Sequence, residues 1–203
     1  FNAVGKVDLA AGKTFTGDID FANQAGTLNA GGLITGDVDG DVHGGAMLPS
    51  GTLIFTAAGG VTGSIGANNT LTEVRFNAGG SAIGLNTNGG GAIKAADFTF
   101  AAADTVTANS AMEGNVDFAS NAGSRLNVAG LITGDVDSTV GSTGTLNFTA
   151  AGGVTGAIGA TNALTEVIFN AGGSAIGLNT NGGGAIKAAD FTFAAADTVT
   201  ANS

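Results

Sequence analysis

The chain lacks several residue types that common functional classes need. Its 203 residues include no cysteine, tyrosine or tryptophan, one proline and one histidine. The absence of cysteine excludes a disulfide-stabilised domain. With His43 as the only histidine, a nucleophilic triad or a transition-metal cluster has almost no ligands or bases to draw on. No stretch is long and apolar enough to span a bilayer, and no signal peptide is visible.

Basic side chains are scarce as well. Six Lys and Arg stand against 16 Asp and Glu, which gives a formal net charge of −10. Proteins bind nucleic acid and anionic membrane surfaces mainly through basic residues. We therefore expect neither nucleic acid as a partner nor direct membrane insertion. The chain is nevertheless 43% hydrophobic and only 11% charged, which is not the composition of a disordered protein.

Phenylalanine recurs at nearly constant intervals along the chain. Similar phrases follow Phe1, Phe21, Phe55, Phe76, Phe98, Phe118, Phe148, Phe169 and Phe191. The gaps are 20, 34, 21, 22, 20, 30, 21 and 22 residues. Six gaps have the length of one turn of a β-solenoid, and units of this size must stack to bury their apolar faces.

A longer repeat is superimposed on the short one. Residues 51–110 and 144–203 are 60-residue copies offset by 93, with five differences and identical final 35 residues. Upstream, the phrase GLITGDVD at 32–39 recurs at 130–137. We interpret residues 1–203 as one continuous solenoid segment with internal blocks 1–110 and 111–203.

Local patterns favour strands. Apolar and polar residues alternate around Val7 and Leu9 and around Ile19 and Phe21, and Gly-rich corners follow such runs. No segment carries helical periodicity. The sequence predicts an all-β, right-handed parallel β-helix of about nine turns of 20–22 residues. The alternative is a tandem of immunoglobulin-like β-sandwiches, whose domains are about the size of one 93-residue block.

The phenylalanines are expected to form the core. We expect eleven or all twelve to be buried, with six aligned along the rod: Phe55, Phe76, Phe98, Phe148, Phe169 and Phe191. The two long gaps should each hold a turn plus a projecting loop. The stretch from His43 to Pro49 should lie in the first loop, because proline and clustered glycine disfavour a central strand.

One acidic cluster is a candidate calcium site. Asp37, Asp39 and Asp41 alternate beside a turn glycine and could offer hard oxygen ligands to Ca²⁺. The other interpretation is a solvated acidic edge that prevents strand-to-strand aggregation. The second block keeps Asp135 and Asp137 but not the third carboxylate, and the GGxGxD calcium repeat is absent. No metal site and no cofactor are therefore assigned.

The acidic residues also suggest a polysaccharide-cleaving face. Paired carboxylates across a cleft would be needed for glycoside hydrolysis. Such a face would comprise Asp18, Asp20, Asp37, Asp39, Asp135 and Asp137. An active site normally occurs once, whereas here the motif is duplicated, so we expect no enzymatic activity and name no catalytic residue.

Two segments carry a family resemblance. Residues 61–80 (VTGSIGANNTLTEVRFNAGG) followed by 90–95 (GGAIKA) resemble the passenger regions of rickettsial-type surface autotransporters, the outer-membrane protein B and surface cell antigen group. Residues 154–173 with 183–188 show the same resemblance. It implies a surface-displayed β-helical passenger with an adhesive or surface-layer role, and it supplies no catalytic residues.

These observations lead to one leading hypothesis and one alternative. The leading hypothesis is a non-enzymatic bacterial cell-surface adhesin or structural passenger segment, extracellular and covalently continued in a longer chain. Its partner would be a host or cell-surface protein. The alternative is a self-assembling extracellular filament or surface-layer subunit that associates end to end.

Overall fold

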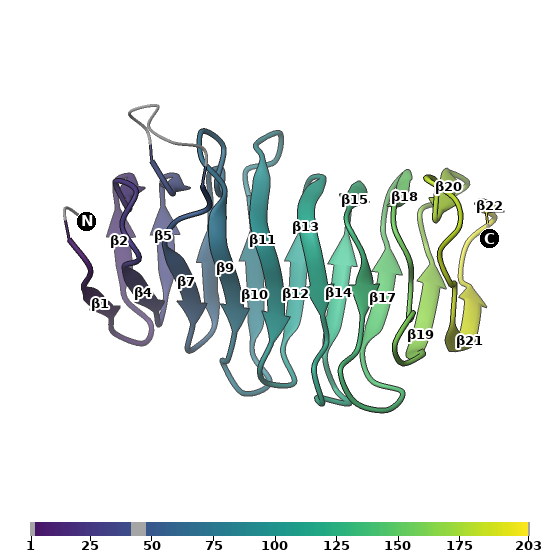
Figure 1. Cartoon of the computed structure of the whole chain (residues 1–203). Coiled ribbons are helices and arrows are strands. Elements are labelled where there is room, and N and C mark those ends of the chain that lie inside the picture. Colours follow the sequence, from purple (N-terminus) through teal and green to yellow (C-terminus); the bar gives the residue numbers. More distant parts are fainter. Residues whose placement is uncertain (1–2, 42–47, 203) are drawn as a thin grey trace.

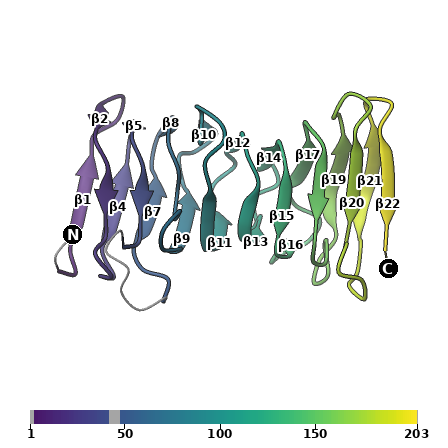
Figure 2. The same cartoon turned by 90° about the horizontal axis from the view of Figure 1, so that it is seen from above.

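The chain forms a rod of stacked parallel strands. The computed structural model describes residues 3–41 and 48–202. The regular secondary structure of these residues consists of β-strands alone. The two termini lie at opposite ends of the rod (Figures 1 and 2). All strand pairs in these residues are parallel, so the fold is a β-solenoid of about nine turns. Tandem sandwiches are excluded because their sheets are antiparallel.

Three ladders of paired residues run along the rod. The first ladder comprises β1 (Lys6–Leu9), β4 (Thr27–Ala30), β7 (Thr52–Phe55), β9 (Leu71–Phe76), the C-terminal halves of β11 (Ile93–Phe100) and β13 (Met112–Asp117), β16 (Val136–Asp137), and single bridges at Ile158 and Ile186. The second ladder comprises β2 (Thr14–Thr16), β5 (Leu33–Thr35), β8 (Gly59–Val61), β10 (Ala82–Leu85), β12 (Thr105–Ala108), β14 (Arg125–Val128), β17 (Thr145–Phe148), β19 (Leu164–Phe169) and β21 (Ala188–Phe193).

The third ladder completes each turn. It comprises β3 (Ile19–Asp20), β6 (Val38–Asp39), a bridge at Ile65, the N-terminal halves of β11 and β13, β15 (Leu131–Thr133), β18 (Gly152–Val154), β20 (Ala175–Leu178) and β22 (Thr198–Ala201). Strands β11 and β13 each contribute to two ladders. In β13, Met112 pairs with Ile132 of β15 while Val116 pairs with Val136 of β16.

Turn length varies more than the phenylalanine spacing predicted. Ladder partners are as little as 18 residues apart, for Phe98 and Val116, and as much as 28 apart, for Ile65 and Ile93. The longest turn contains the Asn-Gly-Gly-Gly corner at 88–91, where Gly89 and Gly90 have φ of 74° and 77°. The strands keep their register because such corners absorb the extra residues outside the ladders.

The two near-identical copies occupy different ladders. Strands β7 and β9 of the first copy lie in the first ladder, whereas their counterparts β17 and β19 lie in the second. From β7 the first ladder passes through β9, β11, β13 and β16, which is four turns, and β17 follows one ladder position later. An offset of 93 residues therefore corresponds to four and one third turns.

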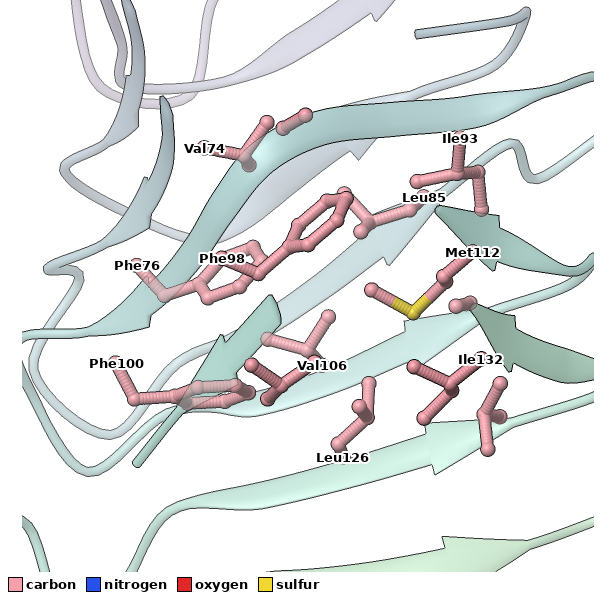
Figure 3. Packing of buried hydrophobic residues seen from close by; sticks show 14 of the residues in the cluster. Val74, Phe76, Leu85, Ile93, Phe98, Phe100, Val106, Met112, Leu126 and Ile132 are labelled. Atoms are coloured by element: carbon pink, nitrogen blue, oxygen red, sulfur yellow. The ribbon is translucent and has the colours of Figure 1, made fainter. Parts of the chain in front are cut away.

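Apolar side chains from all three ladders fill the centre of the rod. Figure 3 shows Phe76, Phe98 and Phe100 packed with Met112 and Val106 between the strands. Aromatic rings contact one another from turn to turn: those of Phe55 and Phe76 are stacked with centroids 5.9 Å apart, and those of Phe76 and Phe100 are tilted by 49° with centroids 4.7 Å apart. Ring pairs at such separations are favourable beyond the area that they bury. Contacts between phenylalanine rings thus recur over several turns of a core that is otherwise mostly aliphatic.

The expectation for the phenylalanine core is wrong in two respects. Phe98 and Phe191 do not continue the stack, because Phe76 pairs with Phe100 and Phe169 pairs with Phe193. Phe15, Phe191 and Phe193 are also 40%, 43% and 60% exposed. These three residues lie in the first and last turns, where the described part of the chain has no further turn to cover them. Phe55, Phe76, Phe98, Phe148 and Phe169 are buried as expected.

The two long gaps contain additional strand positions. The gap between Phe118 and Phe148 contains β14, β15 and β16, followed by a non-strand segment at 138–144. The first gap contains β4, β5 and β6. Of the stretch predicted to project, residues 43–47 lie outside the described residues, and Leu48 and Pro49 are exposed and not in a strand.

One difference between the copies leaves an unsatisfied polar atom. Asn147 is 5% exposed, and its Oδ1 has no hydrogen-bond partner among the described residues. It pairs with Ile168, whereas the first copy has Ile54 beside Arg75. We expect Asn147→Ile to raise the free energy of unfolding by about 1 kcal/mol, because a buried unpaired acceptor carries a desolvation penalty. Urea denaturation measures it.

The control for this substitution is Asn127→Ile. The Oδ1 of Asn127 accepts bonds from Asn147 Nδ2 at 2.8 Å and Arg125 Nε at 3.1 Å. Its replacement should lower the free energy of unfolding. A loss of stability in both variants would contradict the assignment of Asn147 as a destabilising residue.

Candidate functional site

The aspartates of the Thr-Gly-Asp phrases connect successive turns. The Oδ1 of Asp18 accepts the N–H of Asp37 at 2.9 Å, and the Oδ1 of Asp37 accepts the N–H of Ser64 at 2.6 Å. In the second block the Oδ1 of Asp135 accepts the N–H of Ala157 at 2.7 Å. A carboxylate that accepts backbone N–H groups forms a stronger bond than a neutral acceptor does. These side chains therefore hold corners of adjacent turns together.

The second aspartate of each Gly-Asp-Val-Asp phrase accepts backbone N–H groups from a loop of the next turn. Asp39 accepts the N–H groups of Asn68 and Asn69 at 2.9 and 2.7 Å. Its counterpart Asp137 accepts the N–H of Thr161 at 2.9 Å and that of Asn162 at 3.2 Å. Both carboxylates thus stabilise a loop that would otherwise leave backbone donors unpaired.

The aspartates predicted as calcium ligands bind backbone N–H groups and do not form a common ligand cluster. Asp37 and Asp39 direct carboxylate oxygens to the next turn, and Asp41 is buried. Within residues 3–41 and 48–202 no three acidic, histidine or cysteine side chains are close enough to hold a metal ion. The sequence did carry a signal for the structural role, because Asp37 and Asp39 recur as Asp135 and Asp137 whereas Asp41 does not.

The six aspartates considered for a polysaccharide-cleaving face also bind backbone N–H groups. Each of the six carboxylates accepts at least one backbone N–H: Asp18, Asp20, Asp37, Asp39, Asp135 and Asp137. The bonds of five of these carboxylates were described above, and Asp20 accepts the N–H of Ala22 within its own turn. The arrangement orders corners of the rod. The expectation that the chain is not an enzyme stays a prediction.

Sequence reasoning missed the most buried carboxylate. Asp104 is 0% exposed and accepts three N–H groups, from Ala78 at 2.8 Å and from Gly80 and Ser81 at 2.9 Å. Asp197 repeats this geometry in the second copy. The sequence could have indicated this role, because Asp104 and Asp197 each follow an Ala-Gly-Gly-Ser corner by about one turn. Three charge-assisted bonds offset the burial of this carboxylate.

The hydrogen bonds of two carboxylates, Asp137 and Asp197, should make the stability of the protein fall at acidic pH. Burial opposes ionisation of Asp137, but the hydroxyl and N–H of Thr161 and the N–H groups of Ser138 and Asn162 hold its pKa below the ordinary value. The N–H of Ala171 chiefly lowers the pKa of Asp197. A lowered folded-state pKa contributes stability above the unfolded value of about 3.9, and that stability is lost as pH falls through the folded value.

We expect the melting temperature to be flat from neutral pH to about pH 5 and to fall below about pH 4. Asp137→Asn should lower the melting temperature at pH 7 and make the acid fall shallower. Asp190→Asn is the control: it removes the same charge at an exposed position in β21, and it should leave the dependence of the melting temperature on pH unchanged. Equal profiles for the wild type and Asp137→Asn would contradict the role of that carboxylate. Circular dichroism melts between pH 2 and pH 7 measure it.

Both ends of the rod expose the apolar core. At the N-terminal end a hollow of about 450 Å³ is lined by Val7, Asp8, Leu9, Phe15, Asp18, Ile19, Asp20, Leu28 and Ile34. At the C-terminal end Phe191 and Phe193 lie open beside the part-exposed Val199. The strands along the sides of the rod instead alternate buried residues with part-exposed or exposed ones, as in β14 and β20. In the described residues the apolar core is therefore covered along the sides of the rod and open at its first and last turns.

Comparisons with known proteins give no further assignment. No family model, no curated protein and no solved structure matches the chain. The described residues also contain no helix that could cross a membrane.

Proposed function

We propose that this chain is a non-enzymatic structural segment of an extracellular bacterial surface protein, a passenger whose rod holds adhesive surfaces away from the cell. The observation that carries the proposal is the architecture itself. A parallel solenoid extends continuously from β1 to β22, and its aspartates are used to bond one turn to the next. Such a rod provides length and stiffness without a cofactor or an active site.

The composition and the resemblance support the surface location. The chain has no cysteine and a net charge of −10, so it needs no particular redox environment and is repelled by anionic surfaces. The segments at 61–80 and 154–173 resemble autotransporter passengers. In this proposal the open ends continue into neighbouring turns of a longer chain, and a host or cell-surface protein binds the sides.

Surface labelling tests the proposal. An antibody raised against the folded 203-residue rod should label intact cells of the bacterium that makes it, and brief external protease treatment should remove the label. An antibody against a cytoplasmic protein, which should label only permeabilised cells, is the control. Labelling that requires permeabilisation would overturn the proposal. Retention of host cells on immobilised rod, compared with immobilised unfolded rod, separates an adhesive role from a purely structural one.

The second candidate is a subunit of an extracellular filament or surface layer. The regular parallel stacking of strands from β1 to β22 favours it, because the same repeat can be extended by further stacked strands. Unpaired strands with apolar side chains associate readily with further strands.

A further inference from the structure

We propose that two molecules of this chain exchange their near-identical copies in a shifted register. In this exchange the second copy of one molecule, residues 144–203, takes the place of the first copy, residues 51–110, in the other molecule. We define the first entry turn as residues 17–39, on which the first copy stacks, and the second entry turn as residues 114–137, on which the second copy stacks. The inference goes beyond the proposed function, because its partner is another molecule of the same chain.

The two entry turns present nearly the same apolar surface to the copies. Four inward residues of each entry turn pair with the copy stacked on it, namely Leu28, Ala30, Ile34 and Val38 in the first and Leu126, Val128, Ile132 and Val136 in the second. Three of these four positions hold the same residue, and the fourth differs by the two methyl groups that distinguish Val128 from Ala30. Either entry turn therefore has the apolar surface that a copy needs.

The copies in turn present identical residues to their entry turns. The inward residues in these pairs are Leu53, Phe55, Val61 and Ile65 in the first copy and Leu146, Phe148, Val154 and Ile158 in the second. The five differences between the copies lie at other positions. Core packing, which usually specifies the partner of each strand, therefore does not distinguish one copy from the other.

The backbone hydrogen bonds at the two interfaces also match. The N–H of Thr62 donates to the C=O of Ile34 at 3.0 Å, and the N–H of Thr155 donates to the C=O of Ile132 at 2.9 Å. Both threonines also accept, through Oγ1, the N–H of the glycine that precedes the entry-turn aspartate, at 3.2 and 3.1 Å. The second copy therefore has its donors and acceptors in the places that the first entry turn requires.

The carboxylate bonds between turns tolerate the exchange as well. Asp37 accepts the N–H of Ser64 at 2.6 Å, and Asp135 accepts the N–H of Ala157 at 2.7 Å. Both donors are backbone groups, so the difference between serine and alanine does not affect the bond. In the exchanged pair, Asp37 of one molecule would accept the N–H of Ala157 of the other.

The exchange conserves the total number of stacked turns. One rod of the pair becomes longer by four and one third turns, and the other becomes shorter by the same amount. Because the contacts at the exchanged interfaces are equivalent, concentration decides between the two arrangements, as in other domain-swapped proteins. A short linker gives an effective concentration on the order of 1 mM, so the exchange should compete when the chains fold together at about this concentration.

The connecting segments are long enough for the exchange. Residues 138–143 join the second entry turn to the second copy, and an extended segment of six residues reaches about 20 Å. This is about twice the ~10 Å between sheets packed face to face. The segment lies outside the strands, and Val140 within it is 57% exposed. Residues 40–50, which join the first entry turn to the first copy, form a longer connection of eleven residues.

Disulfide trapping between two single-cysteine variants tests the shifted register, since the chain contains no cysteine of its own. In the single rod Thr27 pairs with Thr52, and Thr145 pairs with Arg125. In the exchanged pair, position 145 of one molecule lies opposite position 27 of the other. Neighbouring parallel strands are about 4.8 Å apart, which suits the Cα separation of a disulfide. Thr27→Cys and Thr145→Cys proteins are therefore unfolded in urea, mixed, refolded together and oxidised.

The matched control replaces Thr145→Cys with Thr105→Cys. Thr105 lies in the same outward row of the second ladder as Thr145, because both pair with Arg125. The shifted exchange does not bring Thr105 opposite position 27, so disulfides formed with this variant report random collisions. Circular dichroism verifies that every variant is folded.

We expect the mixture of Thr27→Cys and Thr145→Cys to give severalfold more covalent dimer than the mixture with Thr105→Cys. Wild-type protein refolded at about 1 mM should contain dimers that persist after dilution, because their separation requires unfolding of a copy. Wild-type protein refolded at about 1 µM should remain monomeric. Sedimentation velocity at one final concentration measures both samples.

A doubly substituted protein separates the shifted exchange from an exchange in the original register. In Thr27→Cys/Thr52→Cys, the two cysteines are ladder partners, and a disulfide between them holds the first copy on its own entry turn. The oxidised protein should refold as a monomer at about 1 mM, and the reduced protein should form dimers. Equal dimer formation in both forms would overturn the inference, since only the original register remains open to the oxidised form. Equal trapping by Thr145→Cys and Thr105→Cys, or a wild type without dimers, would overturn it too.

Discussion

Phe100→Ala should lower the free energy of unfolding by about 3–5 kcal/mol, the usual cost of removing a buried phenylalanine side chain. Phe193→Ala should lower it by less than about 1 kcal/mol. The two residues are equivalent positions of the copies, and residues 76–110 and 169–203 are identical. Phe100 is 0% exposed between the rings of Phe76 and Phe118, whereas Phe193 is 60% exposed.

This pair of substitutions isolates burial from local sequence. Both remove the same atoms from the same phrase, so differences in strand propensity cancel between them. Urea denaturation at low protein concentration, followed by circular dichroism, gives both values, and equal slopes verify that the same surface unfolds. Equal losses in the two variants would show that the last turn is covered in solution or that the assigned stacking is wrong.

Gly144→Ala should lower the free energy of unfolding by about 2–5 kcal/mol. Gly144 has φ of +79°, and a Cβ there would lie 2.1 Å from Cγ of the buried Phe118. The substitution therefore combines a left-handed backbone, which costs an L-residue about 1–2 kcal/mol, with overpacking of the ring. Gly51 has the same relation to Phe21, at 2.2 Å, in the first block.

Gly172→Ala is the control for this substitution. Gly172 has a similar φ of +70°, but a Cβ there would meet nothing within 4 Å. It should lose only the backbone contribution, about 1–2 kcal/mol. The difference between the variants then measures the close approach of the chain to Phe118. Thermal and urea unfolding of both proteins provide the comparison, and indistinguishable losses would refute the close contact.

Much of the architecture could be predicted from the sequence. The recurrence of phenylalanine, the alternation of apolar and polar residues and the Gly-rich corners led to an all-β parallel solenoid of about nine turns. The prediction holds because each turn repeats the same physical requirements, namely inward apolar residues and corners that permit positive φ. Asn86 and Asn179, with φ of 50° and 52°, occupy such corners in both copies.

The candidate site was predicted less well. The sequence singled out Asp37, Asp39 and Asp41 for their oxygen chemistry, but it does not contain the identity of their neighbours. Asp39 meets the N–H groups of Asn68 and Asn69 because the next turn places that loop beside it. The role of Asp104 was missed for the same reason, since its three donors lie 23 to 26 residues earlier in the chain.

By itself, the sequence determined the repeat, the strand character and the composition of the core, because these depend on periodicity within each turn. Only the tertiary structure decided which ladder each copy occupies and which phenylalanines are covered. Phe100 and Phe193 have identical sequence surroundings, yet one is buried and the other exposed. Burial in a solenoid is set by the turn stacked above, and that neighbour is a property of position along the rod.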